Sequence, residues 1–164
     1  MISEGQAARL RAEVRRLEPY LAPFITRQAG AATARYILEH RIPRPIQMYL
    51  KVLPAGVSAK LLSQAIQKHA WTFAGSGQFH VIDRFSFEIM DNPLIAGEHS
   101  AHALCHWHRA VFAHLYSELV GPNMACEEVS CAAQGGRSCF FQMQQLPQPA
   151  QNMTQIKAAP AKPL

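Results

Sequence analysis

The spacing of apolar residues changes near residue 71, and this change constrains the fold more than any other feature. Upstream of it, apolar side chains recur every three or four positions, which is the period of a helix packed on one side. Downstream, Phe79 and Val81, and then Phe85, Phe87 and Ile89, alternate with polar residues in the manner of half-buried strands. With 164 residues, 49% of them hydrophobic, the chain can enclose one core. The sequence therefore predicts an α+β fold, with a helical N-terminal half packed on a small antiparallel sheet.

Prolines and glycines divide the chain into elements. Pro19 ends an opening helix, a proline pair within residues 40–45 interrupts the helical half, and Gly121 ends a later helix. The predicted elements are helices over residues 23–39, 46–53, 58–69 and 99–120, a loop over 71–77, strands around 79–81 and 85–89, and a hairpin of 124–132 and 138–143. The side of the second helix expected to be buried carries Phe24, Ile25, Ala29, Ala32, Tyr36 and Ile37.

The expected domain organisation is an N-terminal helix over residues 1–22, one domain over residues 23–145, and a tail over residues 146–164. Proline, alanine, glutamine and lysine predominate in the tail, which is expected to be disordered. No apolar run is long enough to cross a bilayer, so no transmembrane segment is expected. The polar N-terminus lacks the apolar stretch of a signal peptide, and we therefore expect a cytoplasmic protein.

The chain carries 16 basic and 11 acidic residues, a formal net charge of +5. Such a balance is one that nucleic-acid-binding proteins share. In the opening segment, however, arginines are interleaved with glutamates, which is the pattern of a solvated helix, and no dense basic cluster occurs elsewhere. The sequence therefore predicts no nucleic-acid partner. It leaves an acidic protein or a carboxylate-bearing ligand as the other reason for the charge.

Four cysteines in a reducing compartment indicate metal binding or burial before disulfides. Cys131 and Cys139 stand on opposite arms of the predicted hairpin, so pairing of the arms would bring their thiols together. Glu128 precedes Cys131 by three positions, and a bulge or a strand end is needed to aim both at one ion. With Cys105, near the start of the long helix, they make a Cys₃Glu set that suits Zn²⁺ in a structural role. Spacing alone leaves open that these are small buried hydrophobic residues, and Cys126 is interpreted as an ordinary strand residue outside the site.

Histidines near the same helix offer a rival hypothesis. On a helix, His102 and His106 would share a face, and with His108 they could bind a metal or the magnesium of a tetrapyrrole. Solvent-facing or hydrogen-bonded imidazoles are the alternative. Trp71 and Phe73, ahead of a glycine-rich turn, could line an apolar pocket or pack in the core.

Several enzyme motifs are absent from the sequence. It contains no GxGxxG after a strand, no GxxxxGK[ST] loop and no GxSxG elbow. The residues alone therefore identify no nicotinamide or flavin site, and no catalytic residue can be assigned.

The C-terminal cysteines belong to a longer pattern. Glu128-Val-Ser-Cys131, a glycine turn and Cys139-Phe-Phe resemble the C-terminal signature of the 4-vinyl reductase domain family, and the likeness extends upstream through Cys105-His-Trp. In the related sensor domains of phenol-responsive transcription regulators, the matching positions bind zinc. The resemblance therefore implies that Cys105, Glu128, Cys131 and Cys139 hold a structural Zn²⁺.

A closer resemblance covers about residues 27–143. The runs that begin at Arg27, His40, His69 and Asp91, and the run Leu104-Cys-His-Trp-His, are similar to the bacteriochlorophyll-biosynthesis branch of this family. That branch has an N-terminal portion that this sequence is expected to lack. The resemblance implies the fold of vesicle-tethering transport-particle subunits and of small-molecule sensor domains, with a hydrophobic pocket and a homodimer.

The function that this resemblance implies is an accessory role in bacteriochlorophyll biosynthesis. The protein would bind a chlorophyll-precursor tetrapyrrole of the divinyl protochlorophyllide type, and assist its vinyl reduction or its delivery between pathway enzymes. Trp71, Phe73 and His106 are the residues expected to contact the ligand. One alternative is the 8-vinyl reductase itself, which would require NADPH. The other is a sensor of small hydrophobic ligands.

Overall fold

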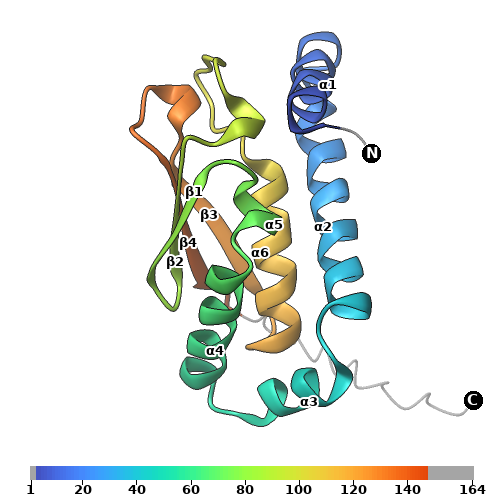
Figure 1. Cartoon of the computed structure of the whole chain (residues 1–164), viewed down its shortest axis with the longest axis vertical. Coiled ribbons are helices and arrows are strands. Elements are labelled where there is room, and N and C mark those ends of the chain that lie inside the picture. The colour runs from blue at the N-terminus through green and yellow to red at the C-terminus, as the bar shows by residue number, and fades with distance from the viewer. Residues whose placement is uncertain (1–2, 148–164) are drawn as a thin grey trace, which may run out of the picture.

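In the computed structural model, which describes residues 3–147, the helical half of the chain lies on one side of a four-stranded sheet (Figure 1). The helices are α1 (Glu4–Leu17), α2 (Ala22–His40), α3 (Arg44–Val52), α4 (Ala55–Lys68), α5 (Trp71–Ala74) and α6 (His106–Leu119). The strands are β1 (Gln78–Asp83), β2 (Ser86–Met90), β3 (Met124–Ser130) and β4 (Cys139–Gln145), and two 3₁₀ turns are η1 (Pro93–Ile95) and η2 (Ala132–Gln134). The predicted α+β class is confirmed.

The sheet is built from two hairpins. Its strand order is β1-β2-β4-β3, and every neighbouring pair is antiparallel. Alternation in the first hairpin places Phe79, Phe87 and Ile89 in the core, as predicted. The two hairpins join where β2 pairs with β4, so residues around the start of β4 lie close to the end of β2.

Helix α6 lies between the sheet and α2 (Figure 1). On the sheet side, the ring of Phe112 packs against those of Phe87 and Phe141, with centroids 5.0 and 5.7 Å away. Tyr116 is fully buried, and its hydroxyl donates to the carbonyl oxygen of Arg84 at 2.6 Å. This bond satisfies the one polar group of a ring that otherwise contributes apolar packing.

The side of α2 that packs on α6 is not the predicted one, except at Ile37. A Cβ atom at Gly30 would lie only 2.5 Å from the carbonyl oxygen of Trp107 in α6, so the two helix backbones approach too closely for large side chains. The buried residues of α2 are therefore mostly small, and the larger ones point outward. Buried are Ala22, Gly30, Ala34 and Ile37, whereas Phe24, Ile25, Ala29, Ala32 and Tyr36 are exposed.

The helix predicted over residues 99–120 begins later, at His106. The preceding segment is irregular, because its backbone bonds to the hairpin instead of to itself: the N–H of Ser100 donates to the carbonyl oxygen of Ala133 at 2.8 Å. His102 consequently precedes the helix, and the expectation that it shares a helix face with His106 is wrong.

Boundaries in the helical half shift by a few residues. Helices α3 and α4 begin earlier than predicted, since Pro45 occupies the first turn of α3 and Pro54 caps α4, positions where a missing N–H costs little. Residues 71–74, predicted as part of a loop, form the single turn α5. The predicted tail lies outside the described residues from position 148 onward. Over residues 3–147, no helix combines the length and the apolar character that a membrane crossing requires.

The close contact of α2 with α6 makes Gly30 a sensitive position. We expect Gly30→Ala to destabilise the protein by about 1–2 kcal/mol, because the overpacking outweighs the better helix propensity of alanine. Gly5→Ala in α1 is the matched control: its new Cβ would meet nothing within 4 Å, so stability should rise slightly or stay unchanged. Thermal unfolding followed by circular dichroism measures both. Equal effects of the two substitutions would contradict the close helix contact.

Candidate metal centre

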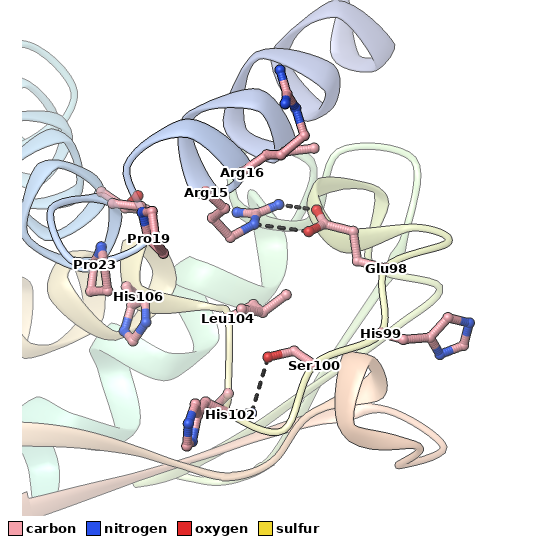
Figure 2. Close-up of a pocket in the computed structure, with 14 residues that line it drawn as sticks. Arg15, Arg16, Pro19, Pro23, Glu98, His99, Ser100, His102, Leu104 and His106 are labelled. Atoms are coloured by element: carbon pink, nitrogen blue, oxygen red, sulfur yellow. Dashed lines mark hydrogen bonds and ion pairs between the residues drawn. The ribbon is translucent and has the colours of Figure 1, made fainter.

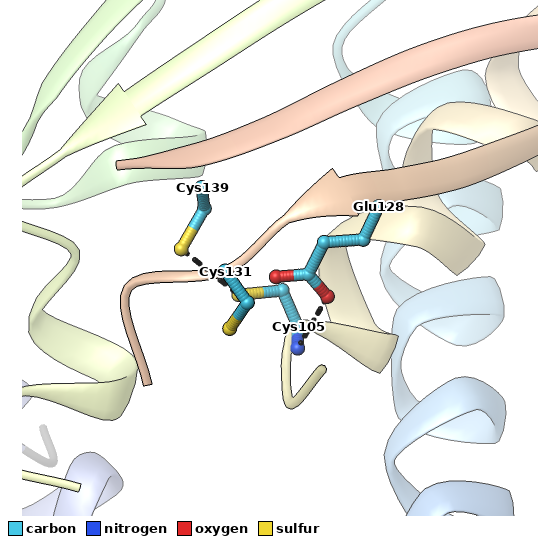
Figure 3. Close-up of side chains that lie close together, drawn as sticks. All are labelled: Cys105, Glu128, Cys131 and Cys139. Atoms are coloured by element: carbon cyan, nitrogen blue, oxygen red, sulfur yellow. Dashed lines mark hydrogen bonds between the residues drawn. The ribbon is translucent and has the colours of Figure 1, made fainter. Parts of the chain in front are cut away.

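The β3–β4 hairpin positions three of the four predicted ligands. The pairing register shifts between Glu128 and Ser130, which marks a β-bulge. The bulge lets Glu128 and Cys131 face the same side, which strict alternation would prevent. Cys139 begins β4 on the other arm of the hairpin (Figure 3). The bulge that the sequence required at this point is present.

The turn between these strands curls back onto Cys131. Its carbonyl oxygen accepts the N–H groups of Gln134 at 3.0 Å and Gly136 at 3.1 Å. Gly135 has a φ of 88°, a left-handed conformation that favours glycine. These bonds hold Cys131 close to the start of β4.

Cys105 reaches the hairpin from the N-terminus of α6. It is the residue immediately before the helix, where unpaired N–H groups and the helix dipole favour a negative charge. Its own N–H donates to Oε2 of Glu128 at 2.9 Å. The segment before it is held to the turn by the side chain of Gln134, which donates to the carbonyl oxygen of Ala101 at 3.0 Å.

The four side chains meet in one cluster, shown in Figure 3. Their ligand atoms, three Sγ and one carboxylate oxygen, all lie within 4.8 Å of one another, and the Sγ atoms of Cys105 and Cys139 are 3.4 Å apart. In a tetrahedral zinc site with bonds of about 2.3 Å, two sulfurs are about 3.8 Å apart. The cluster therefore has the dimensions to hold one metal ion.

Asn92 is a fifth polar residue at the cluster, and one that the sequence reasoning missed. Its buried side-chain amide donates to Sγ of Cys105 at 3.3 Å and to Sγ of Cys139 at 3.6 Å. A donor of this kind stabilises a thiolate and orients it. The sequence around Asn92 carries a signal only for the end of a strand, because its contact with Cys139 spans 47 positions.

Burial makes the cluster hold protons when no cation is bound. Loss of hydration raises the pKa of Glu128 to about 8. Hydrogen bonds with Cys131 and Cys139 raise the pKa of Cys105, and hydrogen bonds from Cys105 and Cys131 lower the pKa of Cys139.

One oxygen of the cluster lacks a partner. Oε1 of Glu128 is buried and accepts no hydrogen bond within residues 3–147. An unpaired buried carboxylate is costly, and a cation would satisfy it. Three soft sulfur donors and one orphaned oxygen together fit a bound metal ion.

Cys126 lies outside the group of four, as expected from the sequence. Its carbonyl oxygen accepts a bond from Nε of Arg109 at 3.0 Å, and burial raises the pKa of its thiol to about 12. A neutral thiol in the core behaves as a small hydrophobic residue.

The histidines of the rival hypothesis do not converge. His108 is fully buried, and its Nε2 lies 2.8 Å from the carbonyl oxygen of Phe73. Burial lowers the pKa of His108 to about 4, so the ring is neutral and Nε2 donates that bond. Among residues 3–147, the Cys₃Glu set is the one group with the spacing of a metal site, and the histidines are not part of it.

An apolar cavity of about 390 Å³ lies between α2, α4, α5 and α6. Trp71 and Phe73 line it, in agreement with the pocket predicted for them. Arg41 and His69 add polar groups that the sequence did not single out, because neither belongs to a recognisable motif. Since Trp71 is 65% exposed, the cavity reaches the surface.

A second cavity, also of about 390 Å³, lies between α1, the start of α2 and the segment before α6 (Figure 2). His106 lines this cavity together with Arg15 and Glu98, which form an ion pair. The structure therefore does not bring the three residues predicted to contact a ligand into one site. Trp71 and Phe73 line the first cavity and His106 the second.

The fold occurs in a solved protein from another context. Trafficking protein particle complex subunit 3 from Naegleria fowleri, in a crystal structure in which it is covalently bound to palmitic acid, matches with a TM-score of 0.57. The match covers 88% of this chain and 95% of that chain at 14% sequence identity. A likeness at this identity shows the fold alone, and it confirms the predicted transport-particle subunit fold.

Sequence comparison is more specific. The 4-vinyl reductase domain family matches residues 85–145, which contain all four residues of the cluster. The bacteriochlorophyll synthase 23 kDa chain of Cereibacter sphaeroides is 47% identical over 145 residues, covering 87% of this chain and 70% of that one. Its counterpart in Rhodobacter capsulatus is 41% identical over 143 residues, covering 86% and 67%. The chain therefore belongs to the family of the bacteriochlorophyll synthase 23 kDa chain, and its residues 85–145 form a domain of the 4-vinyl reductase type.

Proposed function

We propose that this chain is an accessory protein of bacteriochlorophyll biosynthesis that holds a chlorophyll-precursor tetrapyrrole in its apolar cavity. There it assists reduction of a vinyl group, or passes the pigment to a pathway enzyme. The observation that carries the proposal is the 47% identity to a chain whose name assigns it to bacteriochlorophyll synthase. That name also supports the predicted association with pathway enzymes.

The cavity between α2, α4 and α5 suits such a ligand. Its volume of about 390 Å³ lies in the range of small-molecule pockets, and its walls are mostly apolar. Trp71 and Phe73 offer flat faces against which a conjugated ring can stack. Arg41 offers a cation for a carboxylate side chain of the pigment. The pigment would lie partly in the cavity and partly at the surface, where Trp71 is exposed.

We also propose that the Cys₃Glu cluster binds Zn²⁺ in a structural role. Four protein ligands close the tetrahedron and leave no position for a substrate. The ion would join the N-terminus of α6 to both arms of the β3–β4 hairpin, and so contribute to folding. The pigment therefore lies elsewhere than at the metal.

The predicted homodimer remains a proposal. The outward side of α2 supplies a surface for it, since Phe24 and Ile25 are each about half exposed there.

Pigment binding tests the main proposal. Purified protein is titrated with divinyl protochlorophyllide, with and without NADPH, and absorption spectra report both binding and loss of the vinyl group. We expect a spectral shift without turnover, and about tenfold weaker binding by Trp71→Ala, because the variant loses a stacking face. Turnover with NADPH alone would identify the reductase itself, and the absence of any shift would refute the proposal.

Two variants control this experiment. Tyr20→Ala removes an aromatic side chain that is 95% exposed and lines neither cavity, so pigment binding should be unchanged. His106→Ala alters the second cavity only. Loss of binding by His106→Ala, with Trp71→Ala unaffected, would move the ligand to the second cavity and contradict the assignment.

Elemental analysis tests the metal site. We expect about one zinc per chain in fresh protein, and less zinc in Cys139→Ala and Glu128→Ala, with melting temperatures lower by at least about 5 °C. Cys126→Ala, a buried cysteine outside the cluster, is the control and should retain its zinc. A chelator should lower the melting temperature of the wild type but not that of Cys139→Ala. Equal zinc loss in all three variants would show that the ligand assignment is wrong.

The pH dependence of zinc affinity follows from the protons that the cluster holds. Because the pKa of Glu128 is raised to about 8 and that of Cys105 is raised above its usual range, both groups are protonated at neutral pH and zinc must displace two protons. Acid therefore favours the metal-free protein, and affinity should fall about a hundredfold from about pH 7.5 to about pH 6.5. Glu128→Gln has one proton fewer to lose, so its affinity should fall only about tenfold. Competition with a chromophoric chelator measures both slopes, and a flat profile would contradict the mechanism.

A further inference from the structure

Helix α3 carries an exposed apolar face at one end of the molecule, opposite the free end of α1 (Figure 1). The face consists of Met48, Tyr49 and Val52, which are 69%, 57% and 79% exposed. Residues three or four positions apart lie on the same side of a helix, so these side chains form one continuous strip. Leu50, on the other side, is buried against the rest of the protein. The helix is thus amphipathic, but most of its apolar side is turned away from the core.

The charge around this face has one sign. Between Glu39 and Asp83 the sequence contains five basic residues and no acidic one. Arg44 and Lys51 are seven positions apart, so they follow one edge of the apolar α3 face. Lys51 approaches Glu118 at 3.4 Å, whereas Arg44 has no acidic partner within salt-bridge distance in residues 3–147. The basic residues are Arg41, Arg44, Lys51, Lys60 and Lys68.

We propose that the α3 end of the protein docks on the surface of a membrane that contains anionic lipids. The apolar α3 face enters the boundary between headgroups and acyl chains, while Arg44, Lys51 and Lys60 lie against lipid phosphates. Interfacial helices bind by the sum of these two attractions, and they need no membrane-spanning segment. Charge complementarity is what selects an anionic surface over a neutral one.

Other occupants fit this surface less well. In a twofold dimer through α3, the cations of one copy would face those of the other. A nucleic acid would pair with the cations but leave Met48 and Val52 without an apolar partner. A protein interface needs about 800 Å² per partner, and a helix of nine residues is only about 13 Å long.

The docking surface lies next to the apolar cavity. Arg41 lines that cavity and stands three positions before the first residue of α3. Docking would bring the cavity close to the lipid, from which a lipophilic pigment could enter. This consequence rests on the proposed function, whereas the docking itself does not.

Vesicle sedimentation of the full chain tests the proposal. The probes are vesicles of phosphatidylcholine alone and of phosphatidylcholine mixed with phosphatidylglycerol, both without pigment. We expect binding to the mixed vesicles only, weakened by salt, because the attraction is partly electrostatic. Val52→Asp and Arg44→Glu should each weaken binding about tenfold or more, since one removes apolar area and the other reverses a charge.

Matched substitutions on α1 control for changes in helix charge. Leu10→Asp alters an aliphatic side chain that is 61% exposed, and Arg16→Glu reverses a charge on the same helix, so both should bind vesicles like the wild type. Circular dichroism checks that every variant is folded. The proposal is overturned if the wild type ignores anionic vesicles, if it binds neutral ones equally well, or if α1 and α3 variants behave alike. A change of sedimentation coefficient in Val52→Asp without vesicles would instead identify a contact between copies. Because pigment is absent, failure here leaves the proposed pigment binding untouched.

Discussion

Helix α6 is enclosed between the sheet and α2, and the positions of the sulfur cluster and of the apolar cavity follow from this double contact (Figure 1). On one side, the ring of Phe112 packs among those of the sheet. On the other, Gly30 allows the backbone of α2 to approach Trp107 closely. A buried aromatic or aliphatic side chain contributes about 1.5–3 kcal/mol, so a helix packed on both sides has little freedom to shift. Its N-terminus therefore presents Cys105 to the hairpin at a defined position.

The cluster and the cavity are connected through the same helix. Cys105 precedes its first turn, and His108, three positions later, donates a hydrogen bond to the carbonyl oxygen of Phe73. Phe73 lines the apolar cavity, so the segment that supplies a metal ligand also holds a wall of the proposed pigment site. A closed four-ligand shell has no room for substrate, and its natural effect is mechanical. In this arrangement a metal ion would stiffen the cavity from a distance and take no part in any reaction.

The expectations that failed share one physical cause. On α2, periodicity assigned the core side to the large residues such as Phe24 and Tyr36, but close helix contact selects small side chains, and these carry no strong hydrophobic signal. Before α6, the composition of residues 99–105 suits a helix, yet bonds to a hairpin more than thirty positions away, such as that of Ser100 to Ala133, hold the segment in another conformation. Asn92 was missed for the same reason, since its sulfur contacts are long-range. In each case, a partner distant in sequence overrides a local preference.

The sequence by itself determined the elements with a strong period and the residues with distinctive chemistry. The alternating strands, the hairpin, the bulge demanded by the spacing of Glu128 and Cys131, and the separation of Cys126 from the cluster could all be predicted, because each depends on neighbours a few positions apart. Only the tertiary structure decided which side of α2 is buried, that Asn92 joins the sulfurs, and that His106 faces a different cavity from Trp71. It also left the apolar side of α3 uncovered, which no local pattern reveals. An amphipathic pattern indicates that a helix has an apolar side, whereas the packing of the remaining chain determines whether that side meets the core or the surroundings.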